Sequence, residues 1–419
     1  MKKYCLITFI FIASIICVAK ADANLENRVS ELNQLVNQQN VRISQLEKNK
    51  STIKNRKFNP DIGLLADITA QKSDSKSDSE GNGKISIREI ELMIGHDVDP
   101  FTRFDSTITF SDFEAVGIEE AYLTRWDLPF DLNLRLGRFR PKVGDASSKH
   151  RDLLLTVDEP LVVQEYFGLE GLFKTGLEIS KYLPFSSDDW TSQIITGILE
   201  GGIGEGGTLF GSTKRIPTYY FHLKNTFDLN DKNYLEFSGT YLSGSSNEDS
   251  THEVNGYGLN LAYTRYINSQ SHFKFQSEFY SQNRNDAYLG TSGISHAGLE
   301  TAHHDEDEHH EKSQIRNKVG TNAINYNPNP FGYYFQPSYR ISSQYEVGIR
   351  YDFVEPVNLI TGKESEETTG LSMFATFFQS EFARWRFQYE NIDFANGDQD
   401  DRFFLQAVVA IGVHKHANN

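Results

Sequence analysis

Cysteine, long apolar runs and common catalytic motifs are all scarce in this chain of 419 residues. Its two cysteines, Cys5 and Cys17, both precede residue 22, so the rest of the chain can form neither disulfides nor thiolate metal sites. After the first residues no run of about 18 apolar residues occurs, which excludes a transmembrane helix. No G-x-S-x-G, H-E-x-x-H or phosphate-binding loop is present, so no common enzyme class is indicated.

Positive charge is also in deficit. The chain carries 57 acidic and 41 basic residues, a formal net charge of −16. A surface this acidic disfavours nucleic acid as a partner.

Residues 1–21 have the features of a secretory signal peptide. Lys2 and Lys3 precede an apolar run, and Ala19-Lys20-Ala21 offers a cleavage site. Lipid attachment at Cys17 is the alternative, but the residues before it form a poor lipoprotein box.

Residues 22–57 are expected to form a periplasmic coiled coil and a polar linker. Apolar residues between 25 and 53 recur at alternating spacings of three and four, which indicates a short coiled coil. A single amphipathic helix is the alternative. The core positions are Val29, Leu32, Val36, Ile43 and Leu46.

From residue 58 to 419 the sequence alternates apolar and polar residues in short segments rich in aromatic side chains. In the segment 344–353, Tyr345, Val347 and Ile349 fall on one face and Glu346 and Arg350 on the other. Aromatic residues make up 13% of the chain, an excess that the aromatic girdles of a membrane barrel explain. The pattern predicts an all-β transmembrane barrel with a polar interior. A large soluble β-sandwich is the alternative.

Sixteen strands can be placed in this region. Connections from even to odd strands are short, whereas several from odd to even strands are long, as expected for periplasmic turns and external loops. The expected strands span 60–70, 84–97, 101–111, 115–127, 131–140, 174–183, 190–200, 216–228, 233–243, 254–267, 271–282, 331–340, 344–354, 370–379, 382–393 and 402–414.

The third external connection, residues 141–173, is long and partly apolar, which argues that it is ordered. Apolar residues exposed at a cell surface would be unfavourable, so we expect the loop to fold into the barrel and narrow a pore. A cap over the barrel mouth is the alternative. Its acidic candidates for the constriction are Asp158, Glu159 and Glu165.

Basic residues near this loop are candidates for the opposite side of the constriction. Arg135 should face the lumen because it alternates with three leucines. Arg138 and Arg140 share the leucine parity, so either Gly137 marks a bulge that turns them inward or they lie at the outer interface. Arginines at positions that face the interior, opposite the acidic third loop, could create an electric field across the pore. Each single arginine is explained equally well as an ordinary polar residue in contact with the water of the lumen. The remaining candidates are Lys149 and Arg151 from the loop and Arg350, Arg384 and Arg386 from the later strands.

A second candidate site lies in the sixth external loop, where histidines and carboxylates crowd the segment from residue 303 to 311. Imidazole and carboxylate groups bind zinc, so the segment could capture zinc or another divalent cation weakly. A solvated charged loop is the alternative. The candidate ligands are His303, His304, Asp305, Asp307, His309 and His310.

The segments NPDIGLLADI, IREIELMIGHDVDP, IEEAYLTRWDLPFDLNLRLGRFR and VDEPLVVQEYFGLEGLFKTGLEIS resemble the first third of porin-like outer-membrane proteins related to the phosphate-selective porins O and P. The resemblance covers about residues 58–180, and the remainder matches only in barrel rhythm. It implies a sixteen-stranded, trimeric porin. It does not establish phosphate selectivity, because the basic ladder of those porins cannot be mapped here.

Together these patterns predict an outer-membrane porin of a Gram-negative bacterium, through which small hydrophilic solutes or ions diffuse. We expect outer-membrane lipid and lipopolysaccharide around it, a homotrimer, no required cofactor, no nucleic-acid partner and no enzyme activity. The alternative function is an outer-membrane protein that captures zinc through the histidine-rich loop.

Overall fold

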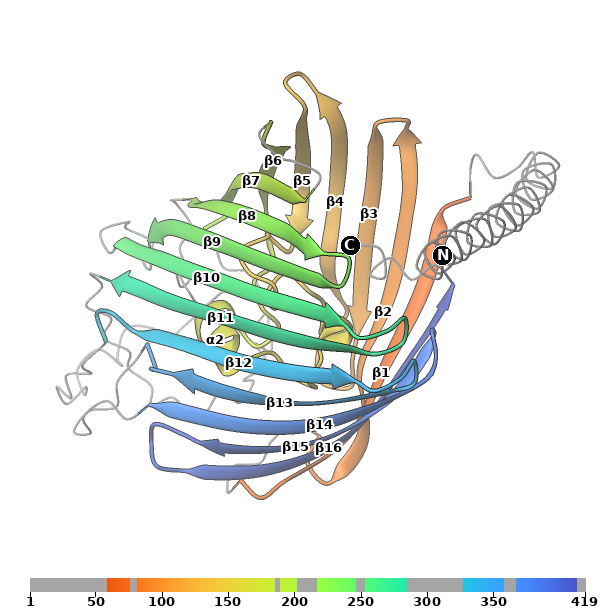
Figure 1. The fold of residues 1–419 in the computed structure, drawn as a ribbon, viewed down its shortest axis with the longest axis vertical. Coiled ribbons are helices and arrows are strands. Elements are labelled where there is room, and N and C mark those ends of the chain that lie inside the picture. Colours follow the sequence, from red (N-terminus) through yellow and green to blue (C-terminus); the bar gives the residue numbers. More distant parts are fainter. Residues whose placement is uncertain are drawn as a thin grey trace, which may run out of the picture. The chain divides into compact units, whose positions relative to one another are not determined.

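The computed structural model describes residues 59–75, 81–184, 189–201, 217–245, 253–284, 327–357 and 367–412. Within these ranges sixteen strands form one closed antiparallel barrel in which β1 pairs with β16 (Figure 1). The predicted all-β barrel of sixteen strands is therefore confirmed. None of the helices in the described ranges is long and apolar enough to cross a membrane.

The strands are β1 (Asp61–Ser73), β2 (Lys84–Asp99), β3 (Thr102–Phe110), β4 (Gly117–Leu128), β5 (Leu132–Phe139), β6 (Lys174–Tyr182), β7 (Trp190–Leu199), β8 (Thr218–Asn230), β9 (Asn233–Ser245), β10 (Glu253–Tyr266), β11 (His272–Arg284), β12 (Phe331–Arg340), β13 (Tyr345–Val354), β14 (Thr368–Ser380), β15 (Ala383–Asp393) and β16 (Gln399–Gly412). Two short helices, η2 (Arg151–Leu153) and α2 (Leu161–Phe167), lie between β5 and β6.

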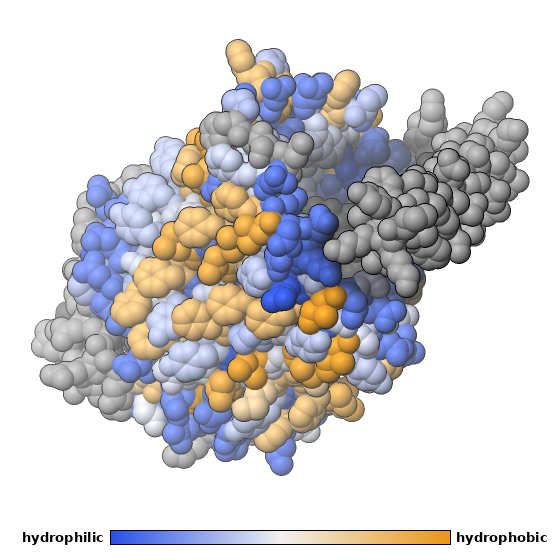
Figure 2. All heavy atoms as spheres, in the orientation of Figure 1, coloured by the Kyte–Doolittle hydropathy of each residue, from blue (hydrophilic) through white to orange (hydrophobic). Residues whose placement is uncertain are grey.

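The alternation along each strand sorts side chains between two faces, as β13 shows. Tyr345, Val347 and Ile349 are each more than 40% exposed, whereas Arg350 and Asp352 are completely buried. Figure 2 shows hydrophobic side chains over the middle of the strands in view and hydrophilic ones near the strand ends. An apolar exterior and a polar interior are the arrangement that a barrel in lipid requires.

Two β-bulges add inward charges that strict alternation would not place there. In β2 the register passes from Glu89 to Ile87, so Arg88 is the extra residue opposite β1. In β4 the register passes from Glu120 to Ile118, so Glu119 is the extra residue opposite β3. A bulge re-aims one side chain, and as a result two consecutive charged residues point to the interior in both strands.

The predicted signal peptide of residues 1–21 and the coiled coil and linker of residues 22–57 lie outside the described residues. The histidine-rich segment from residue 303 to 311 does too. These three predictions therefore stay predictions.

Candidate functional site

The third external loop, residues 140–173, lies inside the barrel. Its backbone is hydrogen-bonded to inward side chains from four strands, and its helix α2 contacts β12 and β13 (Figure 1). The loop therefore folds inward, as its apolar content predicted. Thr240 on β9 donates to the Val143 carbonyl (2.7 Å), and the N–H groups of Ala146, Val157 and Leu161 donate to Glu278 on β11 (2.6 Å), Gln388 on β15 (2.8 Å) and Asp352 on β13 (3.0 Å).

Apolar packing holds helix α2 against the wall. Val162 and Phe167 are completely buried, and Phe167 packs edge-on against Tyr280 of β11, with ring centroids 4.9 Å apart. A side chain at Gly332 of β12 would approach Val162 to 2.7 Å, so glycine is needed for this contact. Burying each such side chain stabilises the loop by roughly 1.5–3 kcal/mol.

Three wall arginines fix the middle of the loop by its carbonyl groups. We call them the arginine clamp: Arg350 of β13 with Arg384 and Arg386 of β15. Their inward parity was predicted, but they do not face an open lumen as free cations. Each donates hydrogen bonds to loop carbonyls, so the three guanidinium groups are held against the loop. Arg350 donates to the Asp158 (2.8 Å) and Glu159 (3.3 Å) carbonyls, Arg386 to those of Leu154 (2.7 Å) and Thr156 (2.6 Å), and Arg384 to that of Asp152.

A second anchor joins the loop to the opposite wall through a glutamate–histidine cluster, formed by Glu91 of β2, Glu119 and Glu120 of β4 and His150 of the loop. His150 Nε2 lies 3.1 Å from Glu120, and its Nδ1 lies 3.3 Å from Glu119 and 3.7 Å from Glu91. Arg140 contacts Glu119 from the side, with Nε at 2.9 Å. All four cluster residues are buried. Because the loop is attached to β2 and β4 here and to β9–β15 across the barrel, it spans the interior.

The predicted constriction residues all fall within the described residues, and every one of their side chains except that of Glu159 is engaged in an ion pair or hydrogen bond, within the wall, within the loop or between the two. Gly137 has a φ of +133°, but the pairing of β5 with β4 and β6 runs unbroken through it, so the expected bulge at Gly137 is wrong. Arg140 contacts Glu119 in the interior because it lies beyond the end of β5, in the loop. The ion pairs are Arg135–Glu178 (2.6 Å), Arg140–Glu119, Lys149–Asp145 (2.6 Å), Arg151–Glu170 (3.0 Å) and Asp158–Arg88 (2.9 Å). Arg138 donates to the Glu119 carbonyl (3.3 Å), and Glu165 accepts from the Val357 N–H (2.9 Å).

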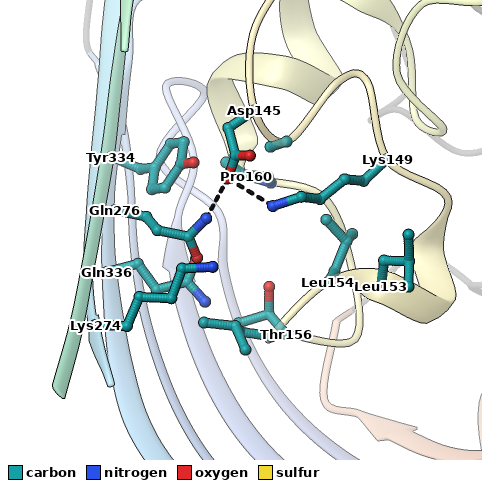
Figure 3. Close-up of a pocket in the computed structure, with 12 residues that line it drawn as sticks. Asp145, Lys149, Leu153, Leu154, Thr156, Pro160, Lys274, Gln276, Tyr334 and Gln336 are labelled. Carbon is teal, nitrogen blue, oxygen red and sulfur yellow. Dashed lines mark hydrogen bonds and ion pairs between the residues drawn. The ribbon is translucent and has the colours of Figure 1, made fainter. Parts of the chain in front are cut away.

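A polar pocket separates the loop from strands β11 and β12 (Figure 3). Asp145 lies between Lys149 and Gln276, and Lys274 points into the same space. Burial alone would raise the pKa of Asp145, but the charges of Lys149 and Lys274 outweigh it and lower the pKa to about 2. The pocket therefore keeps an ionised carboxylate between two cations. Gln336 and Tyr334 of β12 complete this side of the lining.

Glu159 differs from the other loop carboxylates. It is completely buried, and neither of its carboxylate oxygens finds a hydrogen-bond donor in the described part of the chain. Burial raises its pKa to about 8, despite the opposing charges of Arg140 and Arg151. At neutral pH Glu159 is therefore mainly a neutral acid inside the loop.

The buried acid makes the stability of the barrel depend on pH. Between the ordinary pKa of 4.5 and the folded pKa of about 8, the folded state keeps a proton that the unfolded state has released. Stability therefore falls as the pH rises through this window, by at most about 1.4 kcal/mol per pH unit. Glu159→Gln removes this loss, so the variant should exceed the wild type in thermal stability by a margin that grows from pH 5 to pH 8. Unfolding in detergent, followed by gel migration, measures it.

Glu381→Gln is the control for this experiment, because Glu381 is exposed in the turn between β14 and β15. It should show no such pH-dependent gain. A Glu159→Gln gain that is the same at pH 5 and pH 8 would contradict the assignment of a neutral buried acid.

Three features of the site escaped the sequence analysis. The bulges at Arg88 and Glu119 were missed because a bulge has no fixed sequence signal in an alternating strand. His150 was passed over because it is a single histidine in a polar stretch. The arginine clamp was recognised only as inward-facing charge, since its carbonyl partners are remote in sequence.

Comparison with known proteins supports the fold. No protein-family model matches the chain. A protein of Aquifex aeolicus (strain VF5) that is described as uncharacterized is 24% identical over 409 residues, which cover 87% of this chain and 81% of the relative.

Solved structures of similar fold include several outer-membrane proteins. OprB of Pseudomonas putida matches with a TM-score of 0.54 at 8% identity, over 87% of this chain and 96% of its own. The anion-selective porin of Comamonas acidovorans matches with a TM-score of 0.50 at 9% identity, over 84% and 99%. In vitro folded OmpT of Vibrio cholerae, in its trimer form, matches with a TM-score of 0.50 at 8% identity, over 84% and 99%.

The chain thus has the fold of outer-membrane porins, a closed sixteen-stranded antiparallel barrel. At these identities the similarity concerns the fold. The specific relation to the phosphate-selective porins O and P stays a prediction.

Proposed function

We propose that this protein is an outer-membrane porin through which small hydrophilic solutes or ions diffuse passively, with the third loop as its constriction. The observation that carries the proposal is the combination of an apolar barrel exterior with a charged interior crossed by residues 140–173. A polar barrel interior holds a water-filled channel in porins, and sixteen strands are enough to leave an aqueous channel beside a loop.

The same proposal extends to location and assembly. We infer that the barrel lies in the outer membrane of a Gram-negative bacterium, among lipid and lipopolysaccharide, with its N-terminal segment in the periplasm. A homotrimer is supported by the trimer form of OmpT, whose fold this barrel shares. Zinc capture by the segment from residue 303 to 311 remains the alternative function, and no observation on the described residues favours it over the channel.

Single-channel recording tests the proposal directly. Purified protein inserted into a planar bilayer should produce discrete, ohmic conductance steps in potassium chloride. Reversal potentials in gradients of phosphate, chloride and zinc salts would then give the ion preference. The proposal is contradicted if the protein inserts into the bilayer in its folded state but produces no conductance. Heat-dependent gel migration of protein recovered from the bilayer shows that the inserted protein is folded.

A further inference from the structure

The glutamate–histidine cluster has the composition and geometry of a metal site. Glu91, Glu119 and His150 each offer one ligand atom, and these three atoms lie within 4.8 Å of one another. Carboxylate oxygen and imidazole nitrogen form a ligand set that suits zinc and related divalent transition metals. The three residues are at most 4% exposed, so an ion between them would be shielded from water.

Nδ1 of His150 lies 3.3 Å from Oε1 of Glu119 and 3.7 Å from Oε2 of Glu91. Arg140 binds Oε1 of Glu119, while Oε2 of Glu119 has no hydrogen-bond partner within the described ranges, although it is buried. The bulge in β4 is what turns Glu119 toward His150, next to Glu120. A buried carboxylate oxygen without a donor is costly, and a bound cation would satisfy it.

Glu120 contacts the other side of the imidazole ring. Its Oε2 lies 3.1 Å from Nε2 of His150, and Nδ1 is the nitrogen that faces Glu91 and Glu119. A carboxylate that accepts a hydrogen bond from one ring nitrogen orients a histidine so that the other nitrogen can bind a metal. The cluster thus contains the ligands and also the residue that would position one of them.

The charges of the cluster are consistent with a divalent ion. Glu91, Glu119 and Glu120 carry three negative charges when ionised, and Arg140 contributes one positive charge through its contact with Glu119. A neutral His150 and a divalent cation would bring this buried group to neutrality. Buried charges are stable only when paired or bound to metals.

We propose that Glu91, Glu119 and His150 bind a divalent transition-metal ion of the zinc class, and that Glu120 positions His150 for it. The ion would join β2, β4 and the third loop, and so fix one end of the loop to the wall. This site is distinct from the histidine-rich segment of the sixth external loop. It does not depend on the channel function.

Zinc titration of the full-length protein tests the proposal. Because the sixth loop could also take up zinc, the measurement starts from a variant in which His303, His304, His309 and His310 are replaced by Ala. After treatment with a chelator, this background protein should bind one zinc ion per chain by calorimetry. Adding Glu120→Gln should weaken the affinity for zinc by about 10–100-fold, because Glu120 orients His150 but does not bind the metal itself. Adding Glu91→Gln, which removes a ligand, should weaken it by at least as much.

Glu278→Gln is the matched control, because Glu278 is a buried wall carboxylate that also holds the loop but lies outside the cluster. It should bind zinc as the background does. Heat-dependent gel migration shows whether each variant folds, and anomalous diffraction from wild-type crystals with zinc should place the ion between the three ligands. The proposal is overturned if the background protein binds no zinc, or if Glu91→Gln binds zinc as tightly as the background does. An anomalous peak away from the three ligands would overturn it too.

Discussion

Deleting residues 148–165 should raise the single-channel conductance severalfold. This segment contains the carbonyls held by the arginine clamp, the Glu159 carboxyl and the first residues of helix α2. It spans the interior between the cluster on β2 and β4 and the wall at β13 and β15. Conductance through an aqueous pore grows with its open cross-section, so removing the obstruction should have the largest effect of any change considered.

The control is a deletion of equal length, residues 296–313, from the sixth external loop. It removes the histidine-rich segment and should leave the conductance nearly unchanged. The deletion in the third loop exposes part of the wall, so its folding is verified first by heat-dependent gel migration and by a strand-rich circular dichroism spectrum. If a folded deletion variant conducts like the wild type, the third loop does not limit the pore.

The barrel could be predicted from the sequence because the alternation that specifies it lies within each single strand. Alternation along β13 places Tyr345 and Val347 outside and Arg350 inside without knowledge of any other strand. The sorting of connections into short and long ones gave the strand number and the end at which the third loop begins. Lipid imposes both patterns, since each strand must present apolar residues to it and no sheet edge can stay open.

The contacts of the loop could not be predicted because they depend on partners far away in sequence. Val157 bonds to Gln388 and Leu161 to Asp352, and no spacing rule connects these positions. The bulge at Glu119 is equally hidden, because one extra residue inverts the expected face of its neighbours. The sequence therefore identified the charged residues of the interior but not which of them bind one another.

Arg350→Met should release the middle of the loop and destabilise the folded barrel. Arg350 is completely buried and joins Asp352 (2.6 Å) and Glu390 (3.5 Å) of the wall to the carbonyls of Asp158 and Glu159. Removing one partner of a buried ion pair costs about 3–5 kcal/mol, because the remaining charge stays buried without compensation. We expect a lower unfolding temperature, together with larger and noisier conductance steps than the wild type shows.

Two further variants separate the charge effect from the release of the loop. Arg350→Met combined with Asp352→Asn removes an uncompensated carboxylate but keeps an acceptor for the Leu161 N–H, so it should regain part of the stability while the conductance stays high. Arg340→Met is the matched control, because Arg340 also faces inward and pairs with Glu346 (3.3 Å), but it bonds to the turn at Ser342 and Ser343 and not to the loop. Its conductance should equal that of the wild type. If Arg350→Met and Arg340→Met change the conductance alike, the clamp does not hold the loop in place, and the inward charges act on the pore only through the general field of the wall.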